Sequence, residues 1–108
     1  MHLHHLGLEV RNLERAVAFY RSLYGFVEES RWNLMGEQIV FLQKGAFRLE
    51  LYEGADPTAS HLCFSVENLD PYLTSLPLLE GPTHLENGWR NAFFQGPDGE
   101  VLELLQLE

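Results

Sequence analysis

The chain has 108 residues, of which 45% are hydrophobic and 12% aromatic, and its 16 acidic and 7 basic side chains give a formal net charge of −9. This composition indicates one packed globular domain rather than a disordered chain, and the negative charge disfavours both a nucleic-acid partner and an anionic membrane surface. Because there is no signal-like segment, no apolar run long enough to span a bilayer and only one cysteine, we expect a cytoplasmic protein with neither an internal disulfide nor a cysteine-built zinc site.

The first predicted element is a strand from His4 to Val10, whose apolar and polar residues alternate. Leu6 and Leu8 lie on one face of this strand, and His5 and Glu9 lie on the other. We therefore expect the helix that follows to pack on the leucine face, so that His5 points away from that helix.

That helix is predicted from a capping residue, from apolar residues at helical spacing and from a glycine at its end. Asn12 can accept a hydrogen bond at the start, Leu13, Val17 and Tyr20 recur at helical spacing, and Gly25 supplies the end. Three strands are then predicted, at Val27 to Trp32, Gln38 to Gln43 and Phe47 to Tyr52.

A short polar join from Gly54 to Ser60 precedes a second series of the same elements, which starts with a strand at His61. Its helix is predicted to be capped by Asn68 and to end near Leu76, before Pro77. The remaining strands are predicted at Thr83 to Glu86, Ala92 to Gln95 and Val101 to Gln106, with a turn at Pro97 to Gly99 before the last. The fold class is thus α+β, a single domain over residues 1–108 with two tandem βαβββ modules, residues 1–54 and 60–108.

The two modules carry an internal duplication. HLGLEVRNL begins at His5 and HLCFSVENL begins at His61, and five of the nine positions are identical. The tripeptide Leu-Glu-Leu, centred on Glu50, recurs centred on Glu103, which lies 42 residues after its histidine, against 45 in the first module. Each module therefore runs from a strand histidine to a strand glutamate.

Strand alternation directs all four of these side chains away from the helices. A lone strand histidine or glutamate is usually a surface residue, but unrelated surface residues would not recur at matching points of a duplication. If the two sheets curl toward each other about a pseudo-twofold axis, the four side chains converge. Two imidazoles and two carboxylates suit one divalent ion, such as Ni²⁺, Co²⁺, Zn²⁺, Mn²⁺ or Fe²⁺. Two further octahedral positions would accept a substrate with adjacent oxygens, and the ion would stabilise the enediolate formed by proton loss beside a carbonyl.

The same residues resemble a known family. His5 to Val10, the run Asn12-Leu13-Glu14, the pairs Phe19-Tyr20 and Gly25-Phe26, His61 to Leu69 and Gly96 to Glu103 are similar to motifs of the vicinal oxygen chelate superfamily. That superfamily includes glyoxalase I, fosfomycin-resistance proteins, extradiol dioxygenases and bleomycin-resistance proteins. The resemblance covers the whole chain and implies curved sheets that form a half-barrel around a metal or ligand cavity.

The resemblance also implies a function. The order His5, Glu50, His61, Glu103 is that of bacterial glyoxalase I, which implies a metal-dependent lyase or isomerase acting on a 2-oxoaldehyde–thiol adduct or a similar small molecule. Glu103 would shuttle the proton and Glu50 would share that work. The family implies a homodimer in which His5 and Glu50 of one subunit meet His61 and Glu103 of its partner.

Two residues depart from the glutathione-using pattern: Glu9 stands where a basic residue is typical, and Gly54 stands where an amide is typical. One alternative is a non-enzymatic binding protein of the bleomycin-resistance type, which generally lacks the four-ligand set. Another is a metal-dependent thiol transferase or dioxygenase, against which Glu50 argues because a fourth ligand removes a coordination position.

Five further residues are candidates for the substrate pocket, each with a plainer structural role as its alternative: Arg48, Cys63, Trp32, Trp89 and Phe94. Arg48 would hold a substrate carboxylate or neutralise Glu9 or Glu50, Cys63 is otherwise a buried thiol, and the aromatic residues are otherwise core. His2, His4 and His84 have no repeat partner and are predicted at the surface.

Overall fold

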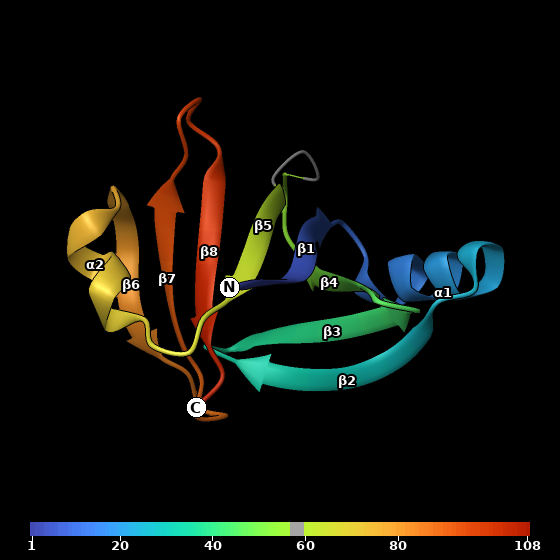
Figure 1. Cartoon of the computed structure of the whole chain (residues 1–108). Coiled ribbons are helices and arrows are strands. Elements are labelled where there is room, and N and C mark those ends of the chain that lie inside the picture. The colour runs from blue at the N-terminus through green and yellow to red at the C-terminus, as the bar shows by residue number, and fades with distance from the viewer. Residues whose placement is uncertain (57–59) are drawn as a thin grey trace. The chain divides into compact units, whose positions relative to one another are not determined.

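The computed structural model describes residues 1–56 and 60–108. They form two compact units, an N-terminal unit of residues His5–Ser60 and a C-terminal unit of residues Met1–His4 together with His61–Glu108. The predicted join from Gly54 to Ser60 includes residues 57–59, which lie outside the described residues. Each unit contains a helix and a four-stranded sheet (Figure 1).

The N-terminal unit has the predicted order of strand, helix and three strands. Its elements are β1 (His2–Val10, of which the residues from His5 on lie in this unit), α1 (Leu13–Tyr24), β2 (Val27–Leu34), β3 (Glu37–Lys44) and β4 (Phe47–Glu53). The strands lie in the order β2-β3-β4-β1, with β1 parallel to β4 and the other neighbours antiparallel. This parallel pairing places the first and last strands of the module side by side, although they are distant in sequence.

Helix α1 begins and ends where its sequence predicts. The Asn12 side chain accepts a hydrogen bond of 3.0 Å from the backbone N–H of Arg15, and Gly25 ends the helix in the left-handed conformation at φ 74°. The Glu53 carboxylate on β4 accepts a further N–H from Leu13, so a strand side chain satisfies another free donor of the first turn.

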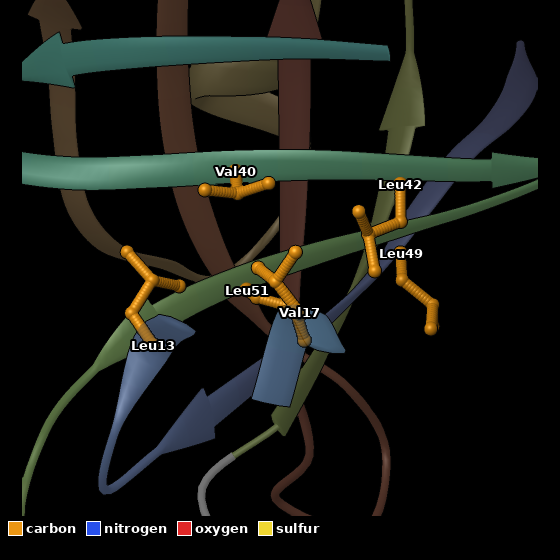
Figure 2. Packing of buried hydrophobic residues seen from close by; sticks show 6 residues of the cluster. All are labelled: Leu13, Val17, Val40, Leu42, Leu49 and Leu51. Carbon is orange, nitrogen blue, oxygen red and sulfur yellow. The ribbon is translucent and has the colours of Figure 1, made fainter. Parts of the chain in front are cut away.

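The core of the N-terminal unit lies between α1 and the sheet, where buried aliphatic side chains of the helix meet those of β3 and β4 (Figure 2). This cluster consists of Leu13, Val17, Val40, Leu42, Leu49 and Leu51. Each such side chain contributes roughly 1.5–3 kcal/mol when it leaves water. Leu6, Leu8 and Val10 of β1 pack against the cluster, as the alternation predicts.

The C-terminal unit repeats the arrangement. Its elements are β5 (Ser60–Ser65), α2 (Asp70–Ser75), β6 (Leu78–His84), β7 (Arg90–Gln95) and β8 (Val101–Gln106). The strands lie in the order β5-β8-β7-β6, with β5 parallel to β8 (Figure 1). The core on the helix side contains Val66, Leu69, Ala92, Phe94 and Leu104. The prediction of two tandem βαβββ modules in an α+β fold is therefore confirmed.

The start of β6 and the cap of α2 differ from the sequence prediction. Strand β6 begins at Leu78 rather than Thr83, because irregular register on both sides of Glu80 lets the strand continue through the Gly81-Pro82 pair that predicted a break. Helix α2 is capped by the backbone of Leu69, while the Asn68 side chain accepts from the N–H of Asp70 at 3.1 Å. Within the described residues, neither helix is long and apolar enough to cross a membrane.

Candidate metal centre

In the N-terminal unit, the predicted histidine and glutamate lie together on the sheet face opposite α1. Glu50 on β4 is paired with Gly7 on β1, which places it beside His5, two residues earlier on the same face. The Nε2 atom of His5 lies 3.5 Å from Oε1 of Glu50. His5 is only 2% exposed, so the sheet face around this histidine is buried.

The C-terminal unit contains the matching pair. Glu103 on β8 is paired with Cys63 on β5, and His61 precedes Cys63 by two residues on the same face. The Nε2 atom of His61 lies 3.0 Å from Oε1 of Glu103, which is 5% exposed. Because burying a carboxylate without a partner is costly, a glutamate this deeply buried requires a cation or hydrogen-bond donors around it. We call each His–Glu pair a half-site.

Each half-site includes an aromatic ring that the sequence reasoning did not select. Phe41 on β3 is paired with Glu50, and its ring meets the His5 ring edge to face, with 5.3 Å between centroids and 68° between planes. Phe93 on β7 is paired with Glu103 and meets His61 in the same way at 5.9 Å and 79°. Such rings restrict the orientation of the imidazoles they contact.

Asn91 is a further residue that the sequence reasoning missed. Its Nδ2 atom donates a hydrogen bond of 2.9 Å to Oε2 of Glu103, the oxygen that does not face His61. Asn91 lies two residues before Phe93 on β7, so both side chains share the half-site face of the sheet. The carboxylate of Glu103 is thus contacted from two neighbouring strands.

The distances within the half-sites fit two ligands of one cation. With bonds of about 2.1 Å, neighbouring ligand atoms are separated by about 3.0 Å in an octahedron and about 3.4 Å in a tetrahedron. The separations of 3.5 Å for His5 and Glu50 and 3.0 Å for His61 and Glu103 cover that range. Imidazole nitrogen and carboxylate oxygen are ligands for Zn²⁺ and its first-row neighbours. Each half-site therefore presents a donor pair that fits a divalent metal ion.

The candidate pocket aromatics have separate contacts. Trp32 donates from Nε1 to the Ser30 hydroxyl at 3.0 Å, within β2. Trp89 meets the His4 ring edge to face at 6.0 Å. Phe94 lies in the helix-side core and is 2% exposed, so its side chain is on the opposite face of β7 from Phe93. Phe94 is therefore a core residue, as its alternative role predicted, and strand alternation places its neighbour Phe93 on the half-site face instead.

The two polar pocket candidates also differ in their surroundings. Cys63 is completely buried on the His61 face, which agrees with the alternative of a small buried thiol. Arg48 donates from its guanidinium to both oxygens of Glu29, at 2.8 and 3.1 Å. Glu29 is a partner that the sequence reasoning did not consider, because it sits at a register shift in β2.

The two residues that depart from the glutathione pattern lie against each other. A Cβ atom at position 54 would overlap the Glu9 carboxyl group, so a side chain there would displace it. The same carboxylate accepts the backbone N–H of Asp56 at 2.5 Å, and Gly54 donates its own N–H to Val10 at 2.9 Å. Glu9 therefore connects β1 to the segment that follows β4, which gives the acidic residue a structural role.

Comparisons with known proteins agree with this architecture. A family model described as Glyoxalase/Bleomycin resistance protein/Dioxygenase superfamily matches residues 4–93, which include His5, Glu50 and His61. Among curated proteins, none matches the chain.

Solved structures with similar folds include several enzymes. A hypothetical protein from Bacillus halodurans C-125 has 18% identity and a TM-score of 0.82, over 98% of this chain and 94% of that one. Methylmalonyl-CoA epimerase from Streptomyces coelicolor, in complex with 2-nitronate-propionyl-CoA, has 21% identity and a TM-score of 0.74, over 98% and 96% of the two chains. Methylmalonyl-CoA epimerase from Mycobacterium tuberculosis has 18% identity and a TM-score of 0.77, over 99% and 88%. With the family model matching most of its length, the chain belongs to the Glyoxalase/Bleomycin resistance protein/Dioxygenase superfamily.

Proposed function

We propose that the protein is a metal-dependent lyase or isomerase that moves a proton from a carbon beside a carbonyl group. The observation that carries this proposal is the repetition of a His–Glu half-site, with Nε2 to Oε1 separations of 3.5 and 3.0 Å, in both modules of a superfamily member. In this proposal His5, Glu50, His61 and Glu103 bind one divalent ion.

The chemistry follows from the donor set. A bound divalent ion supplies positive charge that stabilises the negative charge developing on adjacent substrate oxygens. Glu103, with Glu50 sharing the work, accepts the proton from carbon and returns it to the neighbouring or the same carbon. Phe41 and Phe93 hold the two imidazoles by edge-to-face contact and cover them with apolar surface, which limits the access of water.

Two substrate classes share this proton transfer. The ligand order favours a 2-oxoaldehyde–thiol adduct, as in glyoxalase I, where the proton moves between neighbouring carbons. The similar structures of methylmalonyl-CoA epimerase, one of them with methylmalonyl-CoA, favour an acyl thioester, where the proton returns to the same carbon. The structural role of Glu9 removes one candidate contact for glutathione, so a thiol other than glutathione is the better candidate for the first class.

The test is a paired assay of protein loaded in turn with Ni²⁺, Co²⁺, Zn²⁺ and Mn²⁺. One arm follows methylglyoxal consumption with several thiols and with none, and the other follows exchange of the α-proton of methylmalonyl-CoA in D₂O. We expect metal-dependent turnover in one arm, abolished by Glu103→Gln and kept by Glu67→Gln, whose parent side chain is exposed.

A different result would support the binding-protein alternative. If the protein binds no metal at excess Ni²⁺ or Zn²⁺, is inactive in both arms, and melts at higher temperature with an aromatic or glycopeptide ligand, the enzymatic proposal is wrong. If the protein instead transfers oxygen or a thiol, and its metal is not bound by Glu50, the result favours a dioxygenase or a thiol transferase.

We also propose a homodimer, on family grounds. Light scattering measures its mass, and mixing His5→Ala with His61→Ala protein tests whether subunits share ligands. In a shared arrangement, half of randomly mixed dimers contain one intact site, so about a quarter of the activity returns. If one chain supplies all four ligands, mixing restores none.

A further inference from the structure

The two half-sites differ in one residue on the strand next to the glutamate, Asn91 in one unit and Ile39 in the other. In the C-terminal unit, Oε1 of Glu103 faces Nε2 of His61 at 3.0 Å, while Oε2 accepts the Asn91 amide at 2.9 Å. An ionised carboxylate can only accept hydrogen bonds, so the NH₂ group of Asn91 must be the one turned toward it. The two oxygens of Glu103 therefore have different partners, on two different strands.

The corresponding position in the N-terminal unit has no such donor. Phe41 is paired with Glu50 just as Phe93 is paired with Glu103, so the two strands β3 and β7 are equivalent in register. Two residues before each phenylalanine stand Ile39 and Asn91. The side chain of isoleucine cannot donate a hydrogen bond. The two modules therefore share the phenylalanine but differ in the residue two positions before it.

We infer that Asn91 is a positioning residue for the metal centre. Its hydrogen bond holds the Glu103 carboxylate so that one oxygen, Oε1, is directed to the ion. This inference rests on the proposed metal-dependent function. A charge-assisted hydrogen bond to one oxygen fixes the rotation of the carboxylate, and burial of Glu103 at 5% exposure strengthens that bond by excluding water. The carboxylate is oriented before the ion arrives, which lowers the cost of ordering it on binding.

The position of Glu103 explains why a fixed orientation matters. Loss of the Asn91 hydrogen bond removes one constraint on the carboxylate, which can then rotate more easily to present both oxygens to a cation or turn away from His61. Either change alters the number of oxygen ligands and the positions left for substrate. Asn91 therefore acts on the metal through Glu103, without touching the ion itself.

The test uses Asn91→Leu, which keeps the size of the side chain and imitates the apolar Ile39, together with Asn91→Ala. Metal-free protein is titrated with Co²⁺ by calorimetry, and the visible absorption of the Co²⁺ form is recorded. We expect about 10- to 100-fold weaker Co²⁺ binding and a changed Co²⁺ spectrum in both variants. Asn33→Ala, at an exposed position on β2, is the control and should match the parent chain in both measurements.

Thermal unfolding of the metal-free proteins shows whether each variant is folded at the titration temperature. Folded Asn91 variants with the affinity and spectrum of the parent chain would overturn the positioning role and leave the metal site standing. Failure of the parent chain itself to bind Co²⁺ would overturn the proposed function as well, so the two failures are distinguishable.

Discussion

Phe93 and Phe94 are neighbours on β7 whose side chains face opposite sides of the sheet. Phe94 packs in the helix-side core with Leu104, whereas Phe93 meets the ring of His61. We expect Phe94→Ala to lower the free energy of unfolding by about 3–5 kcal/mol, because it removes a fully buried ring. Phe93→Ala should cost less, because Phe93 is only half-buried.

Chemical denaturation of the two variants measures this difference. Since small domains are stable by only about 5–15 kcal/mol, the Phe94→Ala protein should unfold at a much lower denaturant concentration or lack a folded baseline. Equal losses in the two variants would contradict the assignment of their faces.

Some residues of the half-sites could be predicted from the sequence and others could not. His5 and His61 begin strands of similar sequence, and Glu50 and Glu103 are each the centre of a Leu-Glu-Leu tripeptide, so the duplication marks all four. Phe41, Phe93 and Asn91 lie on other strands, and they reach the half-sites only through the register of β3 with β4 and of β7 with β8. A single strand's pattern does not contain that register, which is why these residues were missed.

Among the secondary-structure elements, the two helices differ in how they start. Asn12 caps α1 through a hydrogen bond to the N–H of Arg15, whereas Asn68 lies one residue before the cap of a six-residue helix. We expect Asn12→Ala to cost about 1 kcal/mol of the free energy of unfolding. Asn68→Ala should cost less, because Asn68 precedes the cap residue Leu69 and its side chain accepts one N–H, that of Asp70, at the start of a much shorter helix. Denaturant melts of both variants test this order, and a larger loss for Asn68→Ala would contradict it.

An ion-pair cluster connects α1 to β2. Arg31 donates to Glu14 on α1 at 2.6 and 3.2 Å and to Glu28 at 3.2 and 2.9 Å. The hydrogen bonds from Arg31 lower the pKa of both carboxyl groups, and the same bonds raise the pKa of Arg31. Because these folded-state carboxyl pKa values are below the unfolded ones, the cluster stabilises the fold at neutral pH, and this contribution is lost as pH falls through the lowered values.

Arg31→Gln tests the cluster. We expect a small drop in melting temperature at pH 7, since exposed ion pairs contribute little. The difference from the parent chain should shrink below about pH 4.3, the ordinary pKa of glutamate, and vanish once both carboxyl groups are protonated. Melting curves between pH 7 and pH 3 provide the measurement, and a difference that does not change with pH would show that the two carboxylates are not its cause.

Element boundaries were predictable where capping chemistry sets them and unpredictable where sheet pairing does. Asn12 and Gly25 define both ends of α1 locally, so the sequence and the structure agree there. Strand β6 continues through Gly81-Pro82 because β7 pairs with it on either side of the irregularity. That stabilisation comes from a neighbouring strand, and the residues of β6 themselves carry no sign of it.

Across the molecule as a whole, the duplication divides the proposed metal ligands equally. Each unit supplies one imidazole and one carboxylate, and neither unit alone supplies the four ligands that the proposal requires. Loss of a ligand from either unit should therefore weaken the same metal site. If the two half-sites were instead independent His–Glu ion pairs, the loss of one residue would not affect metal binding in this way.

Metal content per chain is the decisive measurement for a single ion bound by both half-sites. Chelator-treated protein is reconstituted with Ni²⁺ or Zn²⁺, desalted and analysed for metal, in a His2→Ala background that removes an exposed histidine at the N-terminus. We expect about one ion per chain, and we expect His5→Ala and Glu103→Gln each to lose most of it, while His84→Ala, at an exposed histidine on β6, keeps it. Full metal content in both His5→Ala and Glu103→Gln, or none in the parent chain, would contradict the shared metal site.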